Sequence, residues 1–142
     1  MGYQKVLVPV SGKQRLVRAA RALEQALQIV REDGEICFLH CIDAVPHLIT
    51  GETYRKLVQE AAGEAEKLLE RLVERARNAG IAYSVHIVEG SPVARIPSFV
   101  ANNACNVVVM CSDKEGESVK LAIGATAEQV FQYLSVPLLI VH

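Results

Sequence analysis

Apolar residues in this chain gather in short runs, and longer stretches of mixed character separate those runs. Runs of this length, apolar at almost every position, are typical of strands that are covered on both faces of a parallel sheet. They lie at residues 5–10, 36–42, 107–111 and 137–141. Residues 83–88 instead alternate between polar and apolar, which predicts a strand at the edge of the sheet.

Between these runs, apolar residues recur three or four positions apart, which predicts helices with one buried face. The first predicted helix carries its stripe on Leu16, Ala20, Leu23, Leu27 and Val30, and ends at Asp33-Gly34. The second spans about 53–79, with Ala61, Ala65, Leu68, Leu72 and Ala76 inside and Gly80 as its stop.

Two shorter helices follow. Ser91-Pro92 predicts a helix start, with serine as the cap and proline in the first turn. Pro97 removes a backbone donor, so we expect a kink or a later start there. The last helix is predicted at 126–134, because Thr126 and Gln129 have the spacing of a capping box.

Strands and helices therefore alternate along the whole chain. This order predicts an α/β fold, a three-layer sandwich with helices on both faces of a five-stranded parallel sheet. The 142 residues show neither an internal repeat nor a composition break, so we expect one domain over 1–142.

Composition narrows the class of protein. The formal net charge is −1 and 51% of residues are apolar, which does not suggest a nucleic-acid partner. No apolar run is long enough to span a bilayer and no secretory signal opens the sequence, so we expect a cytoplasmic protein. Its cysteines are then expected to be reduced, buried thiols.

Several segments together resemble the universal stress protein family over essentially the whole length. They are residues 5–10 as the opening strand, Gly90-Ser91-Pro92, residues 107–110, and Gly124-Ala125-Thr126 leading into the last strand. The resemblance implies an adenine nucleotide alpha hydrolase-like fold with strand order 3-2-1-4-5. It also implies a homodimer in which the last strand, Leu138, Leu139, Ile140 and Val141, pairs with its copy.

Many members of that family bind ATP, and the resemblance implies where such a site would lie. Their pattern places an aspartate after the first strand and glycines in the loop after the fourth, so that backbone N–H groups can approach phosphate oxygens. Here Ser11 replaces the aspartate, Cys111 and Lys114 replace the two loop glycines, and Ala125 replaces the hydroxyl residue after Gly124. The candidate cleft positions are Pro9, Val10, Ser11, Ile42, Met110, Cys111, Lys114, Gly124, Ala125 and Thr126.

Other chemistry has weaker support. No Gly-x-Ser-x-Gly turn marks a serine hydrolase, and no histidine pair has metal-ligand spacing. His40, in the middle of a strand, is interpreted as a hydrogen-bonded core residue. Cys111 lies at the mouth of the cleft near Lys114, which raises the hypothesis of a redox-sensitive thiol.

The sequence thus favours a regulatory or interaction module in stress physiology that is not an enzyme and does not bind ATP in the family manner. The expected partners are a second copy and an unidentified protein, with neither catalytic residues nor a metal. The alternative is a sensor of ATP or another adenine nucleotide with Mg²⁺, or a slow ATPase; a further alternative is redox sensing through Cys111.

Overall fold

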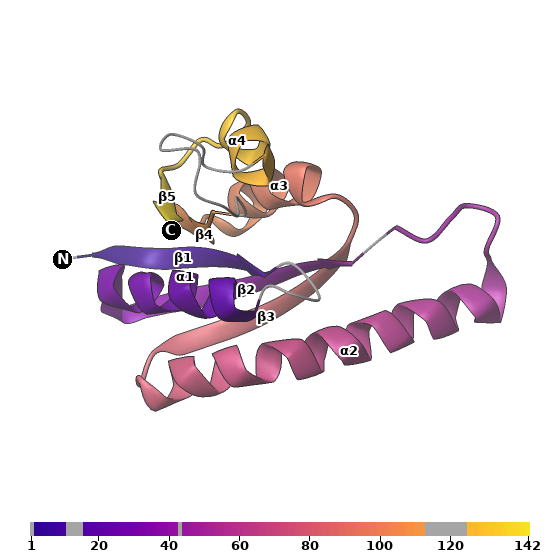
Figure 1. Ribbon diagram of the computed structural model, residues 1–142, viewed down its shortest axis with the longest axis horizontal. Coiled ribbons are helices and arrows are strands. Elements are labelled where there is room, and N and C mark those ends of the chain that lie inside the picture. Colours follow the sequence, from indigo (N-terminus) through magenta and orange to yellow (C-terminus); the bar gives the residue numbers. More distant parts are fainter. Residues whose placement is uncertain (1, 11–15, 43, 113–124) are drawn as a thin grey trace.

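The computed structural model describes residues 2–10, 16–42, 44–112 and 125–142 (Figure 1). In chain order the elements are β1 (Tyr3–Val10), α1 (Leu16–Ile29), β2 (Val30–Ile42), α2 (Gly51–Asn78), β3 (Ala82–Glu89), α3 (Pro92–Asn103), β4 (Val107–Cys111), α4 (Ala125–Phe131) and β5 (Leu138–Val141).

The strands form one sheet of five parallel strands in the order β3-β2-β1-β4-β5. Helices α1 and α2 cover one face, and α3 and α4 cover the other (Figure 1). The predicted α/β architecture and strand order are confirmed, as is the edge position of β3.

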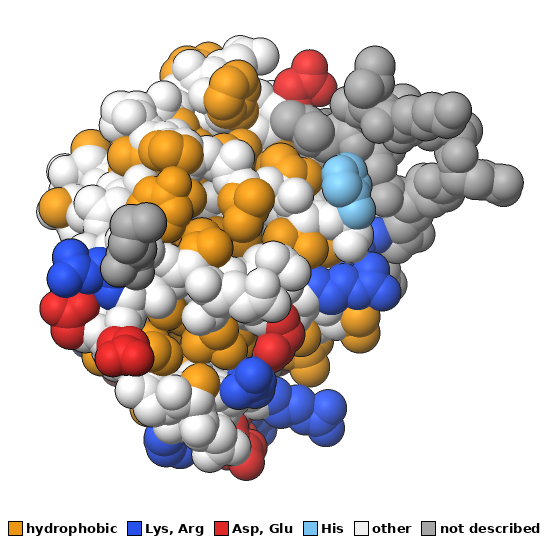
Figure 2. Space-filling view, turned by 90° about the vertical axis from the view of Figure 1, so that its left-hand side faces the viewer, with side chains coloured by type: hydrophobic (Ala, Val, Ile, Leu, Met, Phe, Trp, Pro, Cys, Tyr) orange, Lys and Arg blue, Asp and Glu red, His pale blue; other side chains and the backbone are white. Residues whose placement is uncertain are grey.

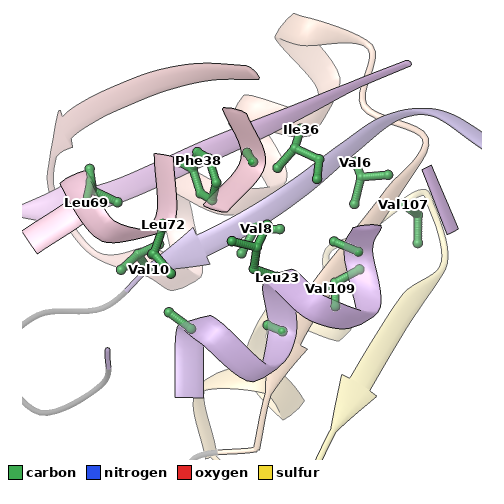
Figure 3. Packing of buried hydrophobic residues seen from close by; sticks show 14 residues of the cluster. Val6, Val8, Val10, Leu23, Ile36, Phe38, Leu69, Leu72, Val107 and Val109 are labelled. Carbon is green, nitrogen blue, oxygen red and sulfur yellow. The ribbon is translucent and has the colours of Figure 1, made fainter. Parts of the chain in front are cut away.

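Alternation along β1 explains why that strand is apolar almost throughout. Val6, Val8 and Val10 join a core with residues of α1 and α2, whereas Leu7 joins a second core with residues of α3 and α4. In the first core, side chains from β1 and β2 meet those of α1 and α2 (Figure 3). A strand buried on both faces needs apolar residues at odd and even positions alike.

The junction of α1 and β2 differs from the prediction. The helix ends at Ile29, and β2 begins at Val30, so Asp33-Gly34 lies inside the strand rather than after the helix. The pairing of β1 with β2 is irregular here: Tyr3 lies opposite Val30, but Lys5 lies opposite Glu35. Because a β-bulge absorbs extra residues, the polar segment stays in the sheet.

The inner faces of the two long helices also differ from the predicted stripes. The fully buried residues are Ala19, Ala22, Leu23 and Ala26 in α1, and Ala65, Leu69, Leu72 and Ala76 in α2. The first turns of α2 extend beyond the sheet (Figure 1), so the predicted inner residue Ala61 is only half-buried.

The short helices confirm one predicted start and correct another. The Ser91 hydroxyl accepts a hydrogen bond from the Val93 N–H at 3.3 Å, as predicted for a cap. The predicted late start of α3 is wrong, since the helix begins at Pro92 and continues through Pro97 to Asn103. The capping box at Thr126 is also wrong, because α4 begins at Ala125 and Thr126 already lies inside it.

Two glycines allow a matched test of this packing. A Cβ added at Gly34 would lie 2.8 Å from the Gln4 carbonyl oxygen and 2.9 Å from Val30 Cγ2, whereas a Cβ at Gly63 in α2 would meet nothing within 4 Å. We expect Gly34→Ala to lower the free energy of unfolding by about 1–3 kcal/mol. Gly63→Ala should raise it by about 0.5–1 kcal/mol, because alanine favours the helix. Urea denaturation measures both, and equal effects of the two changes would contradict the close contacts around Gly34.

Candidate ligand cleft

The sheet opens where β1 and β4 meet at their carboxyl ends. The strand order reverses between these two strands, and in open α/β sheets ligands bind at such a point. β1 and β4 are paired only at Val6 with Val107 and at Leu7 with Val108, whereas β1 and β2 remain paired as far as Val10. The strands beyond Leu7 and Val108 are therefore not joined to each other.

Pro9 gives a physical reason for this opening. The backbone of Lys5 faces β4, because its N–H donates to Asn106 Oδ1 and its carbonyl accepts from the Asn106 N–H, both at 2.8 Å. Backbone directions repeat every second residue, so Leu7 and Pro9 face β4 as well. Proline has no N–H, and the ladder stops where Pro9 would have to donate.

The strand ends bring some of the predicted cleft positions together and separate others. Counting on from Leu7 and Val108, Pro9 lies level with Met110 on the side of the sheet covered by α3 and α4, and both are half-buried. Val10 and Cys111 point to the opposite side and pack into the core under α1 and α2. Ile42, the last residue of β2, is buried.

The remaining predicted positions are only partly described. Thr126 lies in the first turn of α4 and is half-buried, and the backbone of Ala125 begins that helix. Ser11, Lys114 and Gly124 lie outside the described residues. The Cys111 thiol is half-buried against the core, and its redox role stays a prediction.

The sequence did not reveal that a positively charged side chain, Arg95, lies near the carboxyl ends of β2 and β3. Arg95, in the first turns of α3, donates from Nε to the Glu89 carbonyl oxygen at 2.8 Å, and its charge acts on Cys41 near the end of β2. Burial raises the pKa of Cys41 to about 11, with Arg95 opposing the shift, so Cys41 is a neutral thiol at pH 7. Gly90 places Arg95 close to the strand, since its φ of +128° suits glycine and its N–H donates to the Ile42 carbonyl at 2.9 Å.

Glu89 ties the segment before α2 to this edge. Its carboxylate accepts from the Val45 N–H and from the Tyr54 hydroxyl, each at 2.8 Å. These hydrogen bonds hold the pKa of Glu89 below its usual range, and the one from the Val45 N–H has the larger effect. The signal in the sequence was a carboxylate at the end of a predicted strand, directly before Gly90.

His40 is a hydrogen-bonded core residue, as predicted. It is 7% exposed, and its Nδ1 lies 2.6 Å from the Val10 carbonyl oxygen. A carbonyl only accepts, so Nδ1 carries the proton. The bond joins β2 to the last residue of β1.

Within the described ranges, no group of histidine, cysteine, aspartate and glutamate side chains could hold a metal ion. In the same part of the chain, no helix combines the length and the apolar character that crossing a membrane requires.

Comparison with known proteins identifies the family to which this chain belongs. The model of the Universal stress protein family matches residues 2–142, so the chain belongs to this family. Universal stress protein MJ0531 from Methanocaldococcus jannaschii is 24% identical over 142 residues, which cover 98% of this chain and 82% of that protein.

Solved structures share the fold. The universal stress protein from Archaeoglobus fulgidus in complex with dAMP matches with a TM-score of 0.70 and 18% identity, over 100% of both chains. A universal stress protein family protein from Arabidopsis thaliana with AMP bound matches with a TM-score of 0.67 and 23% identity, over 97% of this chain and 90% of that one.

Proposed function

We propose that this chain is a regulatory module of stress physiology that is not an enzyme, and that its cleft does not hold ATP in the family manner. The observation that carries the proposal is the chemistry of the cleft positions. On the side covered by α3 and α4, the described strand ends offer Pro9, Met110 and the neutral thiol of Cys41. Thioether and thiol groups bind phosphate poorly, and Pro9 offers no N–H.

The loop after β4 supports the same proposal at the level of sequence. Residues 112–117 carry three acids and one base, and Cys111 and Lys114 stand at the two glycine positions of the ATP pattern. Acidic side chains beside a triphosphate raise the free energy of the bound state unless Mg²⁺ screens them.

Titration calorimetry with Mg-ATP tests this proposal. We expect no heat of binding at millimolar nucleotide, and no thermal shift. A ligand present at a hundredfold excess over its Kd would stabilise the fold by about 2.7 kcal/mol, which is readily measured. A matched control carries S11D, C111G, K114G and A125S, which restore the pattern and should restore binding. Micromolar affinity of the unmodified chain would overturn the proposal.

A second candidate function is the binding of an adenine nucleoside monophosphate. The Archaeoglobus and Arabidopsis relatives hold dAMP and AMP, and the opening between β1 and β4 lies at the same kind of switch point. Arg95, near the carboxyl ends of β2 and β3, carries one positive charge, which suits one phosphate better than three. Titration of AMP and dAMP beside Mg-ATP separates the candidates: binding of the monophosphates alone, weakened in Arg95→Gln, would support this one.

The last strand is proposed as the homodimer contact. β5 is at the edge of the sheet, and an apolar edge strand favours pairing with another chain. Leu139 is 36% exposed, and Phe131 and Tyr133 nearby in sequence are 59% and 67% exposed. Figure 2 shows apolar side chains gathered on the side of the molecule where β5 lies in Figure 1.

Leu139→Lys should therefore convert a dimer into a monomer. Sedimentation equilibrium should give twice the 15.5 kDa chain mass for the unmodified protein and that mass for the variant. Leu48→Lys, at a loop residue that is 97% exposed, is the control and should leave the mass unchanged. A monomeric unmodified chain at high concentration would rule out this contact.

A further inference from the structure

A groove with a volume of about 320 Å³ lies between helices α1 and α2. It runs between residues 16–24 of α1 and residues 71–75 of α2, and we refer to it as the helix groove. None of its lining residues is a predicted cleft position. A ligand in the helix groove is therefore independent of any ligand in the cleft.

Apolar side chains from both helices line the helix groove. Leu16, Ala20 and Leu23 recur at steps of four and three, which places them on one face of α1. Leu23 and Leu72 are 0% and 2% exposed and belong to the first core, where Figure 3 labels them, so the inner end of the groove is apolar. Val17 is 66% exposed at its outer side. The side chain of Ala20 ends at Cβ, and a longer one there would fill space between the helices.

One ion pair joins the two helices beside the helix groove. Arg75 donates to both carboxylate oxygens of Glu24, from Nε at 2.7 Å and from Nη2 at 2.9 Å. Bidentate pairs of this kind fix geometry as well as charge. The negative charge that Glu24 brings to the groove is therefore already matched.

Arg71 brings a positive charge that is not matched. Its side chain is exposed, and within the described part of the chain it has neither a hydrogen bond nor an ion pair. Arg75 follows four positions later on the same face of α2, where like charges repel each other. Glu74 is also exposed, and its charge acts on Arg77. Two arginines and one glutamate leave the lining of the groove with a net charge of +1.

We propose that the helix groove is a binding site for a medium-chain fatty acid, with the carboxylate on Arg71 and the alkyl chain between the two helices. Ligand sites are mostly apolar with a few placed polar groups, and the volume is at the lower end of their usual range of about 300–1,000 Å³. Leu16 and Leu23 lie about 10 Å apart along the helix axis, close to the length of an extended eight-carbon chain. The carboxylate would also relieve the repulsion between Arg71 and Arg75.

Titration of the full chain with sodium octanoate tests the proposal, with methyl NMR spectra as the readout. We expect the methyl signals of Leu16, Val17, Leu23 and Leu72 to shift and to saturate with a Kd of about 1 mM or below, as the size of the ligand allows. Hexanoate should bind more weakly, by about two- to fourfold for each CH₂ removed. Octanol, which has the chain but no charge, should bind about fivefold more weakly than octanoate.

Variants of the two parts of the site separate charge from shape. Arg71→Gln should weaken octanoate binding about fivefold and leave octanol binding unchanged. Arg55→Gln is the matched control, because it removes the same charge from the turns of α2 that extend beyond the sheet (Figure 1). Ala20→Leu should block both ligands by filling the groove, and circular dichroism checks that this variant folds.

Three results would overturn the proposal. They are no shift of the groove methyl signals at millimolar octanoate, octanol binding as tight as octanoate binding, and equal effects of Arg71→Gln and Arg55→Gln. Each of them is decided without Ala20→Leu, so a folding defect in that variant leaves the test intact.

Discussion

Replacement of Phe38 by alanine should lower the free energy of unfolding by about 3–5 kcal/mol, the range found when a large buried side chain is truncated. Phe38 is 0% exposed and lies near the middle of β2. Its ring points to the layer formed by α1 and α2, among side chains of β1 and α2 (Figure 3). Neighbours on two helices and a sheet cannot collapse far into the space, so the cavity remains.

Urea denaturation at pH 7 measures this change. Leu48→Ala is the matched control, because Leu48 is also a large apolar residue but is 97% exposed. We expect Leu48→Ala to change the stability by less than about 0.5 kcal/mol. A loss below about 1 kcal/mol for Phe38→Ala would contradict its place in the core.

His40→Leu is expected to cost about 1–3 kcal/mol, although leucine is apolar and occupies a similar volume. The change removes the donor of the 2.6 Å hydrogen bond and leaves the Val10 carbonyl buried without that partner. Hydrophobicity alone predicts the opposite sign, because His40 lies in the apolar part of β2, residues 36–42.

Thermal and urea unfolding of His40→Leu and His40→Asn separate these effects. Asparagine can donate through its amide, so it should recover part of the loss if the hydrogen bond matters. Equal stability of His40→Leu and the unmodified chain would show that the bond contributes nothing.

The strands of the sheet were predictable because each one is marked by a short run of apolar residues in the sequence. Residues 6–10 and 107–111 are apolar throughout, and only strands covered on both faces need that pattern. The end of α1 was not predictable, because Val30 continues the helical stripe and Asp33-Gly34 has the composition of a helix stop. A bulge against Tyr3 decides the outcome, and that contact joins residues far apart in sequence.

The strand ends that border the candidate cleft followed from the strand order that the resemblance implied, and the structure puts Pro9 and Met110 level. A ligand at these positions stays a prediction. Arg95 was missed, since an arginine early in a helix has no distinctive pattern until Gly90 turns the chain toward β2.

The short ladder between β1 and β4 divides the sheet mechanically. Three strands lie on one side of it and two on the other, and two residue pairs connect them at one end only. A change in the distance between the carboxyl ends of β1 and β4 would therefore break no ladder hydrogen bond between the two groups of strands.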